Sequence, residues 1–213
     1  MKIGVLTGGG DCAGLNATIR GVVARAEGYG FEVIGIKRGW AGLLEPSTVR
    51  LAYDNVAELV SVGGTVLLTS RTNPFKKEGG PEMVLSNLKR LGLDCLVAIG
   101  GNDTLGVAYR LSKLGVKVVG VPKTMDNDLS STDFTFGFDS AVNVAVEEID
   151  RVKTTGQSHE RVIVVEVITK QRKGLDEAAP SHHDFSTALG KQIQRGKVLI
   201  HPHRIIVTQN RNR

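Results

Sequence analysis

The sequence predicts an α/β fold in which a mostly parallel sheet has helices on both faces. Short β-prone runs alternate along the chain with segments whose apolar residues recur at helical spacing. Three of these runs end directly in loops rich in Gly, Asp or Asn, over residues 8–14, 100–104 and 122–128. Parallel sheets bind ligands beyond the carboxyl ends of their strands, so we expect a binding site where the three loops meet.

The first predicted unit is a strand, a glycine turn and a helix. Lys2–Thr7 is a buried strand that ends in Gly8–Gly10, and helical spacing follows from Leu15 to Ala26. Two further strands are predicted over Glu32–Ile36 and Val66–Thr69. A helix is predicted over Pro81–Leu91, because it has Pro in its first turn and Gly92 just after its end.

The same alternation returns in the middle of the chain. Cys95–Ile99 predicts a strand, Leu105–Leu114 a helix and Val116–Val121 another strand. A polar loop over Pro122–Phe138 precedes a helix whose apolar face runs from Val142 to Val152, with Asp139 as its expected cap. Arg161–Val167 is the last strand predicted in this part.

Residues 168–213 differ from the rest of the chain. Residues 1–167 contain 18 Lys and Arg against 19 Asp and Glu, whereas 168–213 contain 9 against 3. This segment lacks helical periodicity, and its one predicted strand is an isolated one over Arg204–Thr208. We therefore expect a domain over 1–167 and a divergent, poorly packed basic tail over 168–213.

Composition narrows the function classes. The net charge of +5 comes from the tail, whose sole aromatic residue is Phe185, so a nucleic-acid partner is not expected. The short apolar run at the N-terminus suits neither a signal peptide nor a membrane span. Cys12 and Cys95 show neither disulfide nor metal-ligand spacing. We expect a cytoplasmic protein that does not bind membranes.

Two of the glycine loops have both a structural and a functional interpretation. Gly8–Gly10 is either a tight turn or a phosphate-binding loop, since glycines let the backbone approach an anion. In the loop after residue 99, Asp103 is either a helix-terminal cap or a metal ligand, and Thr104 has a hydroxyl that can donate to a phosphate oxygen. No GxGxxG follows any predicted strand, which disfavours an NAD-dependent oxidoreductase.

The loop Pro122–Asp128 has the most unusual composition. Asp126 and Asp128 lie two residues apart, close to Lys123 and Thr124. Two nearby carboxylates raise one carboxyl pKa and an ammonium lowers it, which is how a general base is tuned. The alternative is a solvated turn with Asx hydrogen bonds.

Six segments, in order and spacing, resemble the phosphofructokinase family over residues 1–167, and they resemble its bacterial pyrophosphate-dependent members most. They are GVLTGGGDCAGLNATIRGVV, SRTNPF, AIGGNDTLGVA, PKTMDNDL, TDFTFGFDSAV and SHERVIVVEV. The resemblance implies transfer of a phosphoryl group to the 1-hydroxyl of fructose 6-phosphate, giving fructose 1,6-bisphosphate in glycolysis. It also implies Mg²⁺ as cofactor and a homo-oligomer with sites shared between subunits.

The resemblance assigns roles to particular residues. Asp126 is the implied base, supported by Asp128, with Thr124 at the substrate and Lys123 among the catalytic residues. Arg161 is implied to bind the sugar phosphate of a neighbouring subunit. Asn102 and Asp103 are the implied metal ligands. The implied donor-binding residues are Gly9, Gly10, Arg71, Asp103 and Thr104.

Two positions favour pyrophosphate over ATP as the donor. Family members that use ATP generally have glycine where this chain has Asp103 and Lys123, whereas pyrophosphate users have an acid and a lysine. An aspartate there repels the additional phosphate of a nucleotide, and a lysine neutralises a small inorganic leaving group.

Three departures from the family pattern bear on activity. Asn102 replaces the usual acidic metal ligand, and Ala24 replaces an arginine of the effector site in regulated members. After Val167 the family's Met-Gly-Arg and the rest of its second half are absent, so the resemblance implies that the second domain is missing or incomplete. The alternative function is therefore a truncated or frame-shifted fragment without catalytic activity.

Overall fold

The computed structural model describes residues 1–130, 132–160, 163–165, 197–201 and 204–208, and it divides into two compact units, 1–124 and 125–213. The first contains, in chain order, β1 (Lys2–Gly8), α1 (Leu15–Glu27), β2 (Glu32–Ile36), α2 (Ala41–Leu44), β3 (Thr48–Leu51), α3 (Tyr53–Val56), the 3-10 helices η1 (Ala57–Ser61) and η2 (Pro74–Lys76), α4 (Gly80–Arg90), β4 (Cys95–Gly100), α5 (Asn102–Lys113) and β5 (Val118–Thr124).

The strands of the first unit run in the order β3-β2-β1-β4-β5. β1 pairs in parallel with β2 and β4, β4 pairs in parallel with β5, and only β3 is antiparallel to its neighbour. Gly8 lies opposite Gly100, and Gly100 lies opposite Pro122. This register places the carboxyl ends of β1, β4 and β5 side by side, as the predicted fold class requires.

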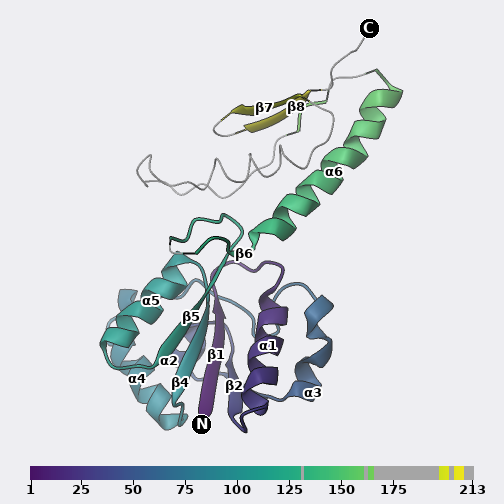
Figure 1. Cartoon of the computed structure of the whole chain (residues 1–213). Helices are drawn as coiled ribbons and strands as arrows, with labels where there is room; N and C mark the ends of the chain where they lie inside the picture. The colour runs from purple at the N-terminus through teal and green to yellow at the C-terminus, as the bar shows by residue number, and fades with distance from the viewer. Residues whose placement is uncertain (131, 161–162, 166–196, 202–203, 209–213) are drawn as a thin grey trace. The chain divides into compact units, whose positions relative to one another are not determined.

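Helices cover both faces of this sheet (Figure 1), which confirms the predicted architecture. α2, α4 and α5 lie on one face, where β1, β2 and β4 contribute Leu6, Ile36 and Leu96 to a fully buried core. α1 lies on the other face with α3, and its Leu15, Ile19 and Val23 are buried. Burial on both faces explains why the central strands are apolar without alternation.

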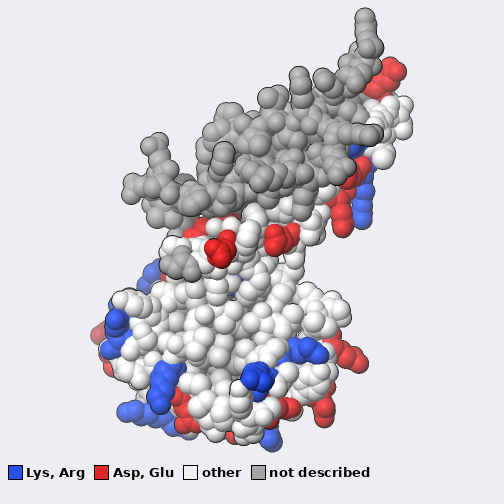
Figure 2. Space-filling model, viewed as in Figure 1, with Lys and Arg blue, Asp and Glu red and all other residues white. Residues whose placement is uncertain are grey.

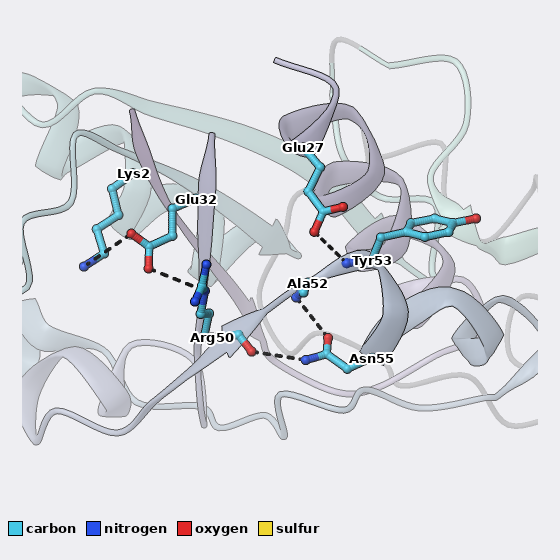
Figure 3. A network of polar contacts seen from close by, with 7 residues as sticks. All are labelled: Lys2, Glu27, Glu32, Arg50, Ala52, Tyr53 and Asn55. Carbon is cyan, nitrogen blue, oxygen red and sulfur yellow. Dashed lines mark hydrogen bonds and ion pairs between the residues drawn. The ribbon is translucent and has the colours of Figure 1, made fainter. Parts of the chain in front are cut away.

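Polar contacts hold the antiparallel edge strand β3 (Figure 3). Glu32 lies 3.8 Å from Arg50 Nε and 3.9 Å from Lys2 Nζ. Just after β3, the Asn55 side chain accepts from Ala52 N at 3.0 Å, and Tyr53 N donates to Glu27 Oε1 at 2.7 Å. These contacts connect the β3–α3 turn to the sheet and to α1.

The charged side chains of the first unit are interspersed on the face seen in Figure 2, where Lys and Arg alternate with Asp and Glu. Mixed charge of this kind differs from the basic stripe typical of nucleic-acid binding. Within the described part of the chain, no helix is long and apolar enough to cross a membrane.

The second unit contains β6 (Phe136–Gly137), α6 (Phe138–Ser158) and a hairpin of β7 (Lys197–His201) and β8 (Arg204–Thr208). β8 coincides with the strand predicted over Arg204–Thr208, and it is paired rather than isolated. Apart from this hairpin, residues 168–213 lie outside the described residues, and their packing stays a prediction. Of the strand predicted over Arg161–Val167, only residues 163–165 are described, and they form no strand.

Three predictions of local structure are wrong. Val66–Thr69 forms turns rather than a strand, because the buried Asn16 amide accepts a hydrogen bond from Val66 N at 2.8 Å and donates to Val62 O at 3.0 Å. Asp139 lies in the first turn of α6 rather than at its cap, since Gly137 takes that position. The loop predicted from Pro122 begins later, because β5 continues to Thr124.

Candidate functional site at the carboxyl ends of β1, β4 and β5

The first feature of the site is the close contact between the ends of β1 and β4 over Thr104. A Cβ atom on Gly8 would lie 2.5 Å from Thr104 Oγ1, and one on Gly100 would lie 2.6 Å from Thr104 Cβ. The side chain of Thr104 is therefore buried beneath the two glycines, with 4% of its surface exposed. The structure thus gives Thr104 a packing contact at the ends of β1 and β4, and its contact with a phosphoryl donor stays a prediction.

The glycine loop after β1 is anchored to residues 69 and 70. Gly9 has a φ of 87°, in the left-handed region that favours glycine. Gly9 N donates to Ser70 O at 2.9 Å, and Thr69 Oγ1 donates to Gly9 O at 2.6 Å. The Gly9 N–H therefore already has an acceptor. Of the two glycines predicted to contact phosphate, Gly10 is the one whose N–H takes no part in these contacts.

Lys123 joins the end of β5 to this loop. Its side chain is buried, with 5% of its surface exposed, and its ammonium donates to the Gly10 carbonyl at 2.5 Å. The same nitrogen would lie 3.7 Å from a Cβ on Gly9. A buried ammonium needs such polar contacts, and its position puts a fixed positive charge beside the glycine loop.

Cys12 reports the electrostatics of this loop. Burial raises the pKa of the Cys12 thiol, the Lys123 charge opposes this shift, and Asp11 adds to it. The thiol is therefore largely protonated at neutral pH and a weak nucleophile. The opposing effect of Lys123 means that its positive charge acts on the Cys12 thiol, two residues after Gly10.

Asp103 places a negative charge in the first turn of α5. α5 begins at Asn102 after the cap residue Gly101, so Asp103 lies where the helix dipole favours a carboxylate. The Asp103 side chain is exposed, and its Oδ1 accepts from Asn73 Nδ2 at 2.9 Å. A Cβ on Gly101 would lie 3.4 Å from the Lys123 carbonyl, so the start of α5 lies against the end of β5.

Asn102 and Asp103 also form the predicted metal site. Among the described residues there is no group of three or more His, Cys, Asp or Glu that would hold a metal ion by itself. Mg²⁺ usually keeps several waters and takes one or two protein carboxylates together with substrate phosphates. One exposed carboxylate fits this mode of binding, in which phosphate oxygens would complete the ligand set.

The remaining predicted residues fall into three groups. Arg71 is exposed and follows Ser70, one of the residues that anchor Gly9. Thr124 ends β5 in the first unit, whereas Asp126 and Asp128 belong to the second, where Asn127 Oδ1 accepts from Thr135 N at 2.9 Å and closes their loop. Arg161 lies outside the described residues.

Sequence reasoning missed two asparagines that shape the site. Asn16 holds residues 62–66 in turns, and Asn73 contacts Asp103. Both are common polar residues separated from their partners by 46 and 30 positions. The one available indication was that Asn73 lies inside SRTNPF, one of the segments that resemble the family.

Known proteins similar to this chain include enzymes of both donor types. A "Pyrophosphate--fructose 6-phosphate 1-phosphotransferase" of Dictyoglomus thermophilum is 58% identical over 168 residues, which is 79% of this chain and 49% of the relative. An "ATP-dependent 6-phosphofructokinase 3" of Streptomyces coelicolor is 53% identical over 169 residues, again 79% of this chain and 50% of the relative. The chain thus spans about half the length of the curated relatives it matches.

A solved structure and a family model agree with these relatives. The phosphofructokinase of Saccharomyces cerevisiae is 32% identical with a TM-score of 0.72, over 78% of this chain and 26% of that one. The family model described as Phosphofructokinase matches residues 2–171, which is more than half of the chain. This chain therefore belongs to the phosphofructokinase family.

Proposed function

We propose that this chain supplies the donor side of a pyrophosphate-dependent 6-phosphofructokinase, which phosphorylates the 1-hydroxyl of fructose 6-phosphate in cytoplasmic glycolysis. The observation that supports this most is the buried Lys123 ammonium on the Gly10 carbonyl, with Asp103 at the adjacent start of α5. Phosphoryl transfer depends mainly on positioning and on charge neutralisation. Family membership supplies the reaction class.

Donor choice follows from the two fixed charges. Pyrophosphate has two phosphates and leaves as inorganic phosphate, so a lysine beside the glycine loop neutralises the whole leaving group. ATP has one further phosphate and a ribose, which would meet the Asp103 carboxylate. Arg71 and the N–H groups of Gly10 and its neighbours would complete the contacts to the donor, and ATP is the less favoured donor.

The acceptor side depends on residues beyond the first unit. Asp126 would take the proton from the sugar 1-hydroxyl, Asp128 would support it, and Thr124 would contact the substrate. A positioned carboxylate base matters because an alcohol has too high a pKa to attack well. Arg161 would bind the sugar phosphate of a neighbouring subunit, which makes the active assembly a homo-oligomer.

Mg²⁺ would be held by Asp103, with the Asn102 amide oxygen as a weaker ligand, and by the donor phosphates. When bound, the ion neutralises phosphate charge. With an amide in place of one acidic ligand, we expect weak affinity for Mg²⁺ without the donor, since the protein contributes a single charge.

A fragment without catalytic activity is the second candidate. Its support is the change in charge balance after residue 167, since residues 168–213 contain 9 Lys and Arg against 3 Asp and Glu. Under this alternative the chain still binds the donor through its first unit.

Two assays separate these candidates. Isothermal titration calorimetry of the full chain with Mg²⁺ tests whether pyrophosphate binds more tightly than ATP, and a coupled assay tests for fructose 1,6-bisphosphate. In an active chain, Asp126→Asn should lower kcat by about two to four decades while leaving donor affinity unchanged. A chain that binds neither donor would refute the proposed function, and donor binding without turnover would favour the fragment.

A further inference from the structure

We infer that Asn73 is a positioning residue that fixes the Asp103 carboxylate for discrimination between donors. The inference rests on the proposed function, because it assigns Asp103 the exclusion of ATP. It concerns a residue of the SRTNPF segment for which local patterns predict no role.

Two hydrogen bonds determine how the Asn73 amide points. Phe75 N donates to Asn73 Oδ1 at 3.0 Å, and Asn73 Nδ2 donates to Asp103 Oδ1 at 2.9 Å. A backbone N–H can only donate, so the amide oxygen must face Phe75 and the amide nitrogen must face the carboxylate. The amide is therefore held in the one orientation that offers a donor to Asp103.

The backbone of Asn73 is also fixed. The residue is extended, with φ −122° and ψ 110°, as expected before a proline, and it caps η2. Pro74 is buried, and a Cβ on Gly80 would lie 2.2 Å from the Pro74 carbonyl, so η2 packs directly on the start of α4. The Asn73 side chain therefore stays in place when the Asp103 carboxylate rotates, and the hydrogen bond favours the one rotamer that reaches it.

A second contact joins the same two segments. The Arg110 guanidinium lies over the Phe75 ring, 3.6 Å from its centroid. Arg110 and Asp103 are seven residues apart on α5, about two turns, so both project from the same side of the helix. Residues 73–75 thus contact α5 at two points, and the spacing between Asn73 and Asp103 is set by the fold.

An exposed aspartate would otherwise sample several rotamers. A carboxylate held in one place repels an additional phosphate at every encounter, whereas a mobile one can turn away. Releasing Asp103 should therefore weaken the exclusion of ATP with little change in the affinity for pyrophosphate.

The test compares Asn73→Ser and Asn73→Ala in the full chain, with calorimetric affinities for pyrophosphate and ATP. A serine hydroxyl can still accept from Phe75 N but is too short to reach Asp103. Both variants should raise the ratio of ATP to pyrophosphate affinity by about three- to tenfold, as expected for the net contribution of one exposed hydrogen bond. If the affinity ratio rises in Asn73→Ala but not in Asn73→Ser, the effect comes from the cap of η2, and the inference is overturned.

Two further measurements separate this inference from the proposed function. In the Asp103→Gly background, Asn73→Ser should leave the ratio of ATP to pyrophosphate affinity unchanged. If the ratio rises there as much as in the wild-type background, Asn73 does not act through Asp103. In the donor-free chain, the Asn73 side-chain amide proton should move upfield in the NMR spectrum of Asp103→Gly, and an unmoved resonance would overturn the contact itself. If that resonance moves but the wild-type chain prefers ATP, the proposed donor is wrong although the contact exists.

Discussion

Lys123 and Asp103 bear opposite charges at the ends of neighbouring elements, and the fold holds them in different ways. Lys123 is buried and donates to Gly10, 113 residues away in the chain. Asp103 is exposed and is held by one side-chain contact, from Asn73. The positive charge is therefore part of the packed structure, whereas the negative charge can be replaced at little cost to folding.

This difference bears on how donor preference can change. Replacing Asp103 alters a surface residue, where substitutions usually change stability by less than about 0.5 kcal/mol. Replacing Lys123 removes a buried contact to the glycine loop and leaves space behind. We therefore expect that single changes in donor preference arise more easily at 103 than at 123.

The largest predicted effect tests the packed side of the comparison. Gly8→Ala would place a Cβ 2.5 Å from Thr104 Oγ1, and this overpacking should lower the free energy of unfolding by about 1–3 kcal/mol in urea denaturation. Gly10→Ala is the matched control, because nothing lies within 4 Å of its Cβ, and it should cost less than about 0.5 kcal/mol.

Thr104→Ala should relieve much of that cost, since the nearest atom to a Cβ on Gly8 is then the Cβ of residue 104, at 3.3 Å. The double variant Gly8→Ala with Thr104→Ala should therefore be more stable than the sum of the single changes predicts. Additive losses would show that Thr104 does not hold the ends of β1 and β4 together.

A smaller effect is predicted on the exposed side. Asp103→Asn keeps the oxygen that accepts from Asn73 but removes a charge from the first turn of α5. The free energy of unfolding should fall by about 0.3–1 kcal/mol, and salt should reduce the difference. Glu78→Gln, an exposed change outside any helix, is the control. A loss as large as that of Gly8→Ala would contradict the comparison.

The smallest effect concerns the Cys12 thiol. Lys123 lowers the pKa of this thiol against the upward effect of burial, so Lys123→Met should move the pKa further up. Less thiolate is then present at a given pH. The pH midpoint of iodoacetamide alkylation at Cys12 should rise, while that of Cys95 stays in place as an internal reference. An unchanged Cys12 midpoint would place the Lys123 charge away from the glycine loop.

The long periodic elements of the first unit could be predicted from the sequence. β1, β2, β4, α1, α4 and α5 combine continuous apolar runs or helical spacing with glycine or proline at their ends. α2, β3 and α3 have four residues each, too few for a period to be read. Val66–Thr69 resembled a strand because tertiary hydrogen bonds from Asn16 are invisible in a local window.

The residue types of the candidate site could be chosen from the sequence, but the surroundings of these residues could not. Its loops follow strand ends, which the fold class places together, so Gly9, Gly10, Asp103 and Lys123 could be grouped in advance. The burial of Lys123 and the contact between Asn73 and Asp103 depend on packing between segments 113 and 30 residues apart. No local pattern encodes such pairs.

Asp103 and Lys123 are proposed to set the donor together, and the most direct test is a four-member cycle of variants. Calorimetric affinities for pyrophosphate and ATP, with Mg²⁺, would be measured for the wild-type chain, Asp103→Gly, Lys123→Gly and the double variant. The wild type should prefer pyrophosphate, and the double variant should shift the ratio toward ATP more than either single change, with a coupling of about 0.5–3 kcal/mol. A wild-type chain that prefers ATP, or a double variant with an unmoved ratio, would contradict the claim.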